Sequence, residues 1–218
     1  MRLENGLVVL EQCEFPGNIG DSCAETCRLY VLKRFIGAPV ENEKEILSQF
    51  ITQKGIIRHP SSPWREDDTS SDQVLPLVVS ATSWNEPIPC SLFLNRTGNG
   101  DLVSPNLFAA QKRLLGKSSW IYDLSILGQS VVFKIPFRWN DEKKSFESSK
   151  DSSCDYLNFV MVLIQAVETN SMTWPIKRAI KITDKDMVLA KIKHYYRSEP
   201  NCENLISAYS LALEKIWR

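Results

Sequence analysis

The sequence has no excess of either charge. Lysine and arginine together number 26, aspartate and glutamate also number 26, and the formal net charge is therefore zero. Proteins dedicated to nucleic acids or to anionic membranes usually carry a basic excess. One local basic excess, over 177–197, falls on two predicted helices, and we interpret it as their solvated faces. We therefore expect neither a nucleic acid nor a membrane as a partner.

Long apolar runs are also missing. The longest uninterrupted one, Phe159 to Ile164, falls far short of the roughly 20 residues that span a membrane. Residues 1–6 include an acid and no continuous apolar segment of the kind that a signal peptide needs. The six cysteines form no Cys-x-x-Cys motif, and without an export signal we expect them to be buried free thiols. These absences together predict a cytoplasmic protein.

Several motifs that identify large enzyme classes are absent as well. The chain contains no Walker loop, no G-x-G-x-x-G, no H-E-x-x-H and no G-x-S-x-G sequence. Its two histidines and its scattered cysteines do not form a standard zinc-binding pattern. The sequence therefore gives no indication of a P-loop nucleotide hydrolase, a dinucleotide-binding enzyme, a zinc protease or an α/β-hydrolase.

Apolar residues recur at helical spacing through most of the sequence. With 218 residues, 43% of them hydrophobic, the chain can bury one sizeable core, and we predict a single helical domain over 1–218. An extended lead-in is expected over 1–20, with a strand or hairpin arm at Leu7 to Leu10, and a polar loop over 138–150. Apolar spacing predicts helices over 22–36, 41–53, 70–83, 87–97, 105–115, 119–136 and 151–168, then two or three more that finish with 201–217.

Three of these helices, 70–83, 119–136 and 151–168, are much more apolar than the others. A helix that is apolar on every side is buried on every side. An inner set of buried helices covered by amphipathic ones is expected of a helical toroid or a multi-helix bundle. The predicted fold class is therefore all-α, either (α/α)-toroid-like or a helical bundle, with a short extended N-terminal segment.

Three helix starts carry a capping-box pattern, in which a serine is followed three residues later by an acid or an amide. The pattern begins at Ser22, at Ser70 and at Ser152. In the first of them, the Ser22 hydroxyl is predicted to cap the backbone N–H of Glu25. At the other end of this helix, Gly37 is predicted to stop it.

Acids gather at these same helix starts. If the apolar helices run parallel, their N-termini share one rim, and the acids would meet in one cleft together with cations, amides and an aromatic side chain. The candidate catalytic residues are Asp21, Asp68, Asp72 and Asp155. The candidate substrate-binding residues are Arg28, Arg58, His59, Trp64, Arg65, Gln73 and Asn158.

Two chemistries suit such a cleft. In glycoside hydrolysis, one carboxylic acid protonates the leaving oxygen while a carboxylate activates water or attacks the sugar. The same oxygen donors could instead hold Mg²⁺ or Ca²⁺, which are hard cations. A third interpretation needs no chemistry, because acids at helix N-termini also cap amides and complement the helix dipole. The acids over 67–72 exceed what one cap requires.

The order of these motifs resembles that of uncharacterised microbial and phage-type helical proteins, which we associate with the (α/α)-toroid fold of carbohydrate-active enzymes. The resemblance is carried by Gly20-Asp21-Ser22, by Arg58-His59-Pro60, by the run from Thr69 to Gln73 and by the run from Asp151 to Asn158. It implies a toroid and a glycan or another glycosyl-bearing small molecule as the partner.

A second and fainter resemblance is to ADP-ribosylglycohydrolases, which are all-helical and hold two Mg²⁺ ions on acids. It is carried by Gly20-Asp21-Ser22 with Glu25, by Asp67-Asp68-Thr69 and by the pair Asp151 and Asp155. Three hypotheses therefore remain open: a carbohydrate-active or glycan-binding protein, an Mg²⁺-dependent hydrolase of ADP-ribosyl-type bonds, and a non-catalytic helical interaction module.

Overall fold

The structure, a computed structural model, describes residues 1–10, 21–53, 55–61, 71–84, 88–89, 105–133, 137–140, 145–148 and 153–218. Over these residues the fold is all-α with many helices, as predicted, and the strands form two small antiparallel hairpins. Whether the helices close into a toroid stays a prediction. None of the described helices is long and apolar enough to cross a membrane.

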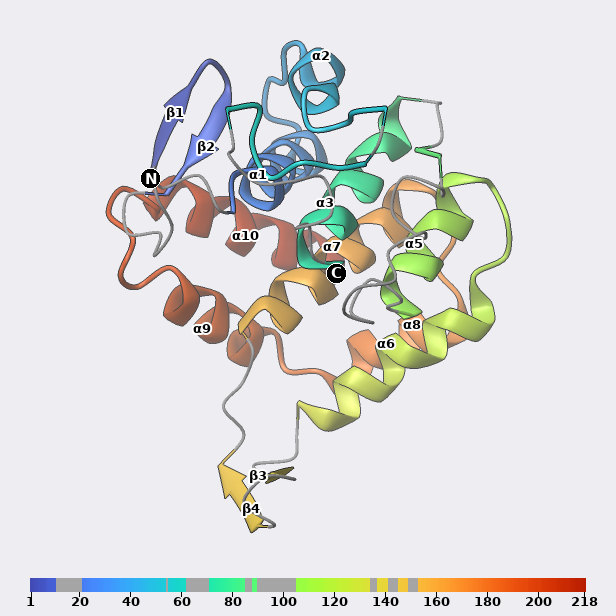
Figure 1. The fold of residues 1–218 in the computed structure, drawn as a ribbon. Helices are drawn as coiled ribbons and strands as arrows, with labels where there is room; N and C mark the ends of the chain where they lie inside the picture. The colour runs from blue at the N-terminus through green and yellow to red at the C-terminus, as the bar shows by residue number, and fades with distance from the viewer. Residues whose placement is uncertain are drawn as a thin grey trace.

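The elements follow one another along the chain as shown in Figure 1. The strands are β1 (Arg2–Glu4), β2 (Leu7–Val9), β3 (Phe137–Asn140) and β4 (Ser145–Ser148). The helices are α1 (Ser22–Ile36), α2 (Glu43–Ser48), α3 (Ser71–Ser80) with a 3-10 turn η2 (Ala81–Ser83), α5 (Pro105–Leu114), α6 (Trp120–Val132), α7 (Ser153–Glu168), α8 (Trp174–Ile182), α9 (Lys185–Tyr195) and α10 (Glu203–Ile216).

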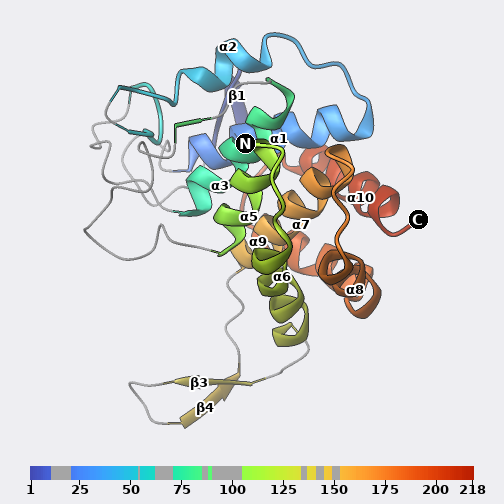
Figure 2. The ribbon, with the colours of Figure 1, turned by 90° about the vertical axis from the view of Figure 1, so that its right-hand side faces the viewer.

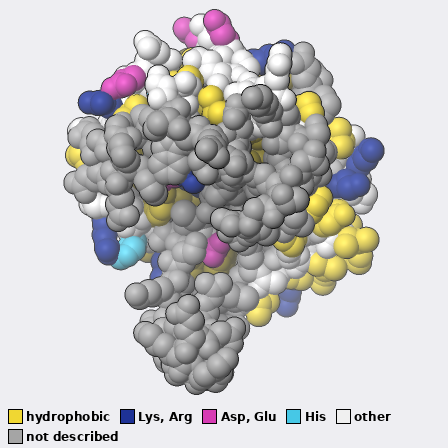
Figure 3. All heavy atoms as spheres, viewed as in Figure 1, with side chains coloured by type: hydrophobic (Ala, Val, Ile, Leu, Met, Phe, Trp, Pro, Cys, Tyr) yellow, Lys and Arg dark blue, Asp and Glu magenta, His cyan; other side chains and the backbone are white. Residues whose placement is uncertain are grey.

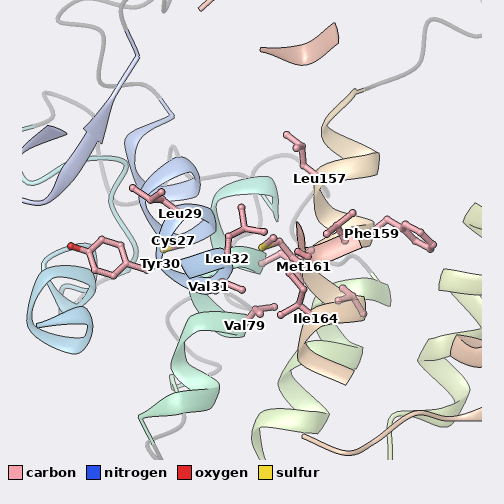
Figure 4. Close-up of a cluster of buried hydrophobic side chains, with 14 of the residues drawn as sticks. Cys27, Leu29, Tyr30, Val31, Leu32, Val79, Leu157, Phe159, Met161 and Ile164 are labelled. Atoms are coloured by element: carbon pink, nitrogen blue, oxygen red, sulfur yellow. The ribbon is translucent and has the colours of Figure 1, made fainter. Parts of the chain in front are cut away.

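Helix α7 forms the centre of the core. Every side chain from Tyr156 to Ala166 is buried, which confirms that the third apolar helix is covered on all sides. Helices α1, α3, α5, α9 and α10 all pack against it (Figure 1 and Figure 2). Figure 4 shows Met161 and Ile164 of α7 facing Leu32 of α1 and Val79 of α3.

The N-terminal hairpin is confirmed. Strands β1 and β2 pair around Asn5 and Gly6, whose φ angles are 50° and 82°. Positive φ at both turn residues is what a tight type I′ hairpin turn requires, and the Asn-Gly pair favours it. The backbone N–H of Val8 donates to Thr26 Oγ1 at 2.8 Å, which attaches the hairpin to α1.

The expectation that the helix over 119–136 is buried on every side was wrong, because α6 exposes Ile121 (70%) and Trp120 (49%).

Two local predictions were also wrong. Helix α2 ends at Ser48 rather than at 53. The backbone N–H of Thr52 donates to the carbonyl of Gly55 at 2.8 Å, and the turn that this bond closes lets Ile51 and Ile56 pair as an antiparallel β-bridge. The polar loop predicted over 138–150 contains most of a hairpin instead. In it the register pairs Trp139 with Phe146, and aromatic residues favour strands. This hairpin lies apart from the helices in both Figure 1 and Figure 2. The helix predicted over 87–97 falls outside the described residues, apart from 88–89.

A buried carboxylate joins the helices α5, α6 and α8. The side chains of Asp123 in α6 and Arg113 in α5 are fully buried, and Arg113 Nη2 donates to Asp123 Oδ1. Asp123 Oδ2 accepts hydrogen bonds from Ser119 Oγ at 3.0 Å and from Thr173 Oγ1 at 2.6 Å. Because Ser119 and Thr173 are the N-cap residues of α6 and α8, one side chain fixes the starts of both helices against α5.

We expect Asp123→Asn to lower the free energy of unfolding by about 3–5 kcal/mol, because the change leaves the Arg113 guanidinium buried without its counter-charge. Urea denaturation followed by circular dichroism measures the loss. Glu41→Gln, which removes an exposed carboxylate outside any helix, is the matched control and should leave stability unchanged. A loss for Asp123→Asn that is no larger than that of the control would contradict the role of the buried pair.

Candidate functional site

Three of the predicted site residues meet at the N-terminal end of α1. Gln73 Nε2 donates to Asp21 Oδ1 at 2.8 Å, and Arg58 Nη1 lies 3.7 Å from the same oxygen. The side chain of Asp21 is 37% exposed and that of Arg58 is 15% exposed. Because Gln73 lies in the first turn of α3, these contacts bring the N-terminal ends of α1 and α3 together, and a rim shared with the other apolar helices stays a prediction.

The capping of α1 differs from the prediction. Ser22 is the first helical residue, not the cap, and its buried hydroxyl has no hydrogen-bond partner in the part of the chain that the structure describes. Gln73 Oε1 instead accepts from the backbone N–H of Ala24 at 3.2 Å, and the carbonyl of Arg58 accepts from the N–H of Cys23 at 2.9 Å. Segments distant in sequence therefore satisfy the amides that start α1.

Asp21 occupies the N-cap position, but its side chain accepts no hydrogen bond from the helix amides. Its carboxylate contacts Gln73 and Arg58 instead. The interpretation that this acid is present only to cap the helix therefore does not fit its contacts. The exposed part of the carboxylate is available to a ligand.

A second polar layer lies one helical turn deeper and is completely buried. Glu25 Oε1 accepts from Arg28 Nη1 at 2.5 Å, and Glu25 Oε2 accepts from the hydroxyl of Tyr196 at 2.5 Å. Arg28 Nη2 donates to Asn158 Oδ1 of α7 at 3.3 Å. The layer therefore holds α1 against α7 and against the residue that ends α9, and it supports the rim above it.

Burial dominates the titration of this layer. Desolvation raises the pKa of Glu25, although the Arg28 guanidinium and the Tyr196 hydroxyl both act to lower it, and nearby Asp21 raises it further. Burial, and then the Glu25 carboxylate, raises the pKa of Tyr196 well above its ordinary value. Glu25 is fully buried and already accepts two hydrogen bonds, so its role is to position α1 rather than to meet a ligand.

His59 is also structural in its visible contacts. Its Nδ1 accepts from the backbone N–H of Ser61 at 3.0 Å, which closes the turn after Arg58. Burial lowers the pKa of His59.

Except for Asp155, the remaining predicted site residues lie outside the described residues or are described only in part. Trp64, Arg65, Asp68 and Asp151 lie outside the described residues. Asp72 lies in the first turn of α3, where only its backbone is described. Asp155 is half-buried in the first turn of α7, and its charge adds to the burial that raises the pKa of neighbouring Tyr156. The part of the cleft assigned to these residues stays a prediction.

The possibility of Mg²⁺ or Ca²⁺ binding likewise stays a prediction. Among the described residues, no three or more His, Cys, Asp or Glu side chains are grouped as a metal ion would need. Several of the acids on which the metal hypothesis depends, Asp67, Asp68 and Asp151, lie outside that part of the chain.

Sequence reasoning missed the roles of Glu25 and Tyr196. Glu25 was interpreted as half of a capping box, whereas it is one member of a buried ion pair. A signal was present, because the charged pair Glu25 and Arg28 stands among small and apolar residues in a stretch that is otherwise suited to burial. For Tyr196, which lies 171 residues away from Glu25, the sequence holds no comparable signal.

We expect Tyr196→Phe to destabilise the protein by about 2 kcal/mol near neutral pH, because Glu25 loses a hydrogen bond to its charged form. A carboxyl whose folded pKa is raised favours folding most below its unfolded pKa, and this contribution falls as pH rises through the folded pKa. The hydrogen bond from Tyr196 lowers the pKa of Glu25, so its removal raises that pKa further. The loss in the variant should therefore be larger at about pH 8 than at about pH 5.

Urea denaturation at the two pH values measures this difference. Tyr122→Phe is the matched control, because Tyr122 is half-buried and stacks on Phe108 through its ring, which the change keeps. A Tyr196→Phe loss that is the same at both pH values would show that the hydroxyl does not act on the Glu25 carboxylate.

Comparison with known proteins adds no relative: no family model, no curated protein and no solved structure matches the chain.

Proposed function

We propose that the protein binds a glycan at the N-terminal end of α1 and cleaves a glycosyl bond there, with Asp21 acting on the ligand. The observation that supports the proposal is the exposure and the hydrogen bonding of the Asp21 carboxylate. This carboxylate is more than one-third exposed, makes no cap bond to its own helix, and is oriented by Gln73 and Arg58.

The groups at the rim suit a polyhydroxylated ligand. A sugar hydroxyl both donates and accepts, so it can donate to the Asp21 carboxylate while it accepts from an amide or a guanidinium. Arg58 supplies a guanidinium beside that carboxylate, and the buried side chain of Gln73 holds the carboxylate in place. Planar groups fixed by neighbouring contacts lose little conformational freedom when a ligand binds.

Cleavage requires two carboxyl groups on either side of the glycosidic bond. In the proposed reaction, Asp21 acts as the carboxylate that activates water or attacks the sugar. The general acid comes from the other predicted acids, Asp68, Asp72 or Asp155. Glu25 is not a candidate for either role because it is completely buried and paired with Arg28.

Asp21→Asn tests the proposal, because the isosteric amide can still accept from Gln73 while the negative charge is lost. We expect glycan affinity to fall about tenfold or more, as for a lost hydrogen bond to a charged group, and cleavage to disappear. The melting temperature should be unchanged. Calorimetric titration against a panel of oligosaccharides and an assay for released reducing ends measure both effects.

Glu41→Gln is the control, since it removes an exposed carboxylate that follows the C-terminal end of α1, whereas the rim is at the N-terminal end. Wild-type protein that binds and cleaves no member of the panel would overturn the proposal and favour a non-catalytic helical module. Asp21→Asn that keeps full binding and turnover would overturn the assignment of Asp21.

A further inference from the structure

Two exposed tryptophans begin neighbouring helices. Trp120 is the first residue of α6 and is 49% exposed, and Trp174 is the first residue of α8 and is 62% exposed. The residues before them, Ser119 and Thr173, both donate to Oδ2 of Asp123. The buried carboxylate therefore fixes the positions of both helix starts, and each start carries an indole outward.

Aliphatic side chains extend this surface. Ile121 is 70% exposed and Leu124 is 42% exposed, and both lie within one turn of Trp120 on α6. We name Trp120, Ile121, Leu124 and Trp174 the tryptophan face. Figure 3 shows hydrophobic side chains gathered at the edge of the molecule where α6 begins, at the lower right of the view. Contiguous exposed apolar residues of this kind mark a site of interaction.

Exposed cations accompany the tryptophan face. On α8 the side chains of Lys177, Arg178 and Lys181 are exposed, and with Trp174 they occupy positions i, i+3, i+4 and i+7 of one helical side. Lys117 is exposed just before α6.

No exposed acid balances these cations in the two segments concerned. Over 105–133 and 169–183 the sequence contains a single acid, Asp123, and it is buried against Arg113. The exposed acids Asp184 and Asp186 follow after the end of α8, and the Asp184 carboxylate accepts from the first amides of α9. Within α6 and α8 themselves the exposed side chains are therefore apolar and cationic, although the whole chain is neutral.

We propose that the tryptophan face docks on the surface of an anionic membrane. Tryptophan favours the membrane–water interface, where its ring is buried and its N–H stays hydrated. Aliphatic residues beside it add buried apolar area, and lysine and arginine are attracted to anionic headgroups. The net charge of zero led us to expect no membrane partner. In the fold, however, the cations of α8 lie on a helix that carries no acid, so the charges that cancel over the whole chain do not cancel on this surface.

Co-sedimentation with lipid vesicles tests the proposal. The protein should pellet with vesicles of equal parts phosphatidylcholine and phosphatidylserine but not with phosphatidylcholine alone, and salt should weaken the binding. Trp120→Ala should lower affinity about tenfold through lost apolar burial. Lys177→Ala and Arg178→Ala should lower it about fivefold each.

Leu211→Ala and Lys193→Ala are the matched controls. Leu211 is 56% exposed on α10 and Lys193 is exposed on α9, helices that lie on the other side of the view from α6 in Figure 1. Both variants should bind vesicles as the wild type does. All these positions are exposed, so the variants should keep the wild-type circular dichroism and melting temperature.

Three results would overturn the proposal. The first is no binding to the anionic vesicles, or equal binding to both vesicle types. The second is binding that Trp120→Ala and Trp174→Ala leave unchanged. The third is a protein that does not bind vesicles and instead uses the tryptophan face to self-associate or to bind a glycan or an acidic peptide.

Discussion

Burying a carboxylate and a guanidinium in the interior of a protein costs free energy, and this cost falls when the two groups pair and accept or donate further hydrogen bonds. Glu25 and Arg28 pair on α1, and Asn158 of α7 and the Tyr196 hydroxyl each add a hydrogen bond, whereas Arg28 Nε has no partner among the described residues. Breaking such a pair costs far more than forming it gains, so the pair selects one arrangement of the helices over others. The rim that carries Asp21 lies one turn above and depends on this arrangement.

The same constraint acts again at Asp123. This carboxylate is buried against Arg113, and its second oxygen accepts the cap hydroxyls of two helices. In both places a buried acid joins three segments, and the surface feature of interest lies within one helical turn of it. Asp21 is four residues before Glu25, and Trp120 is three residues before Asp123. The buried acids therefore set the positions of both surfaces, although neither acid is accessible to a ligand itself.

Periodicity predicted what depends on neighbours along the chain. Helix α7 could be anticipated because its run of apolar residues has to be covered on all sides, and the end of α1 could be anticipated because Gly37 adopts the left-handed conformation that stops a helix. The Asp21–Gln73 contact joins the starts of α1 and α3, which is one part of the rim that the sequence predicts.

The errors arose where a distant residue replaced a local partner. Ser22 has the sequence of a helix cap, but Gln73, which lies 49 residues after Ala24, supplies the acceptor for the Ala24 amide. A local pattern states only which groups could pair, and the tertiary fold decides which of them do.

The net charge is a poor predictor of partners for a similar reason. It is a sum over all residues, whereas the fold decides which of the charges lie on the same surface. A neutral total is compatible with a cationic face on α8 once the acids lie elsewhere or are buried, as Asp123 is. Electrostatic predictions about partners therefore require the charges of one surface, not of the whole sequence.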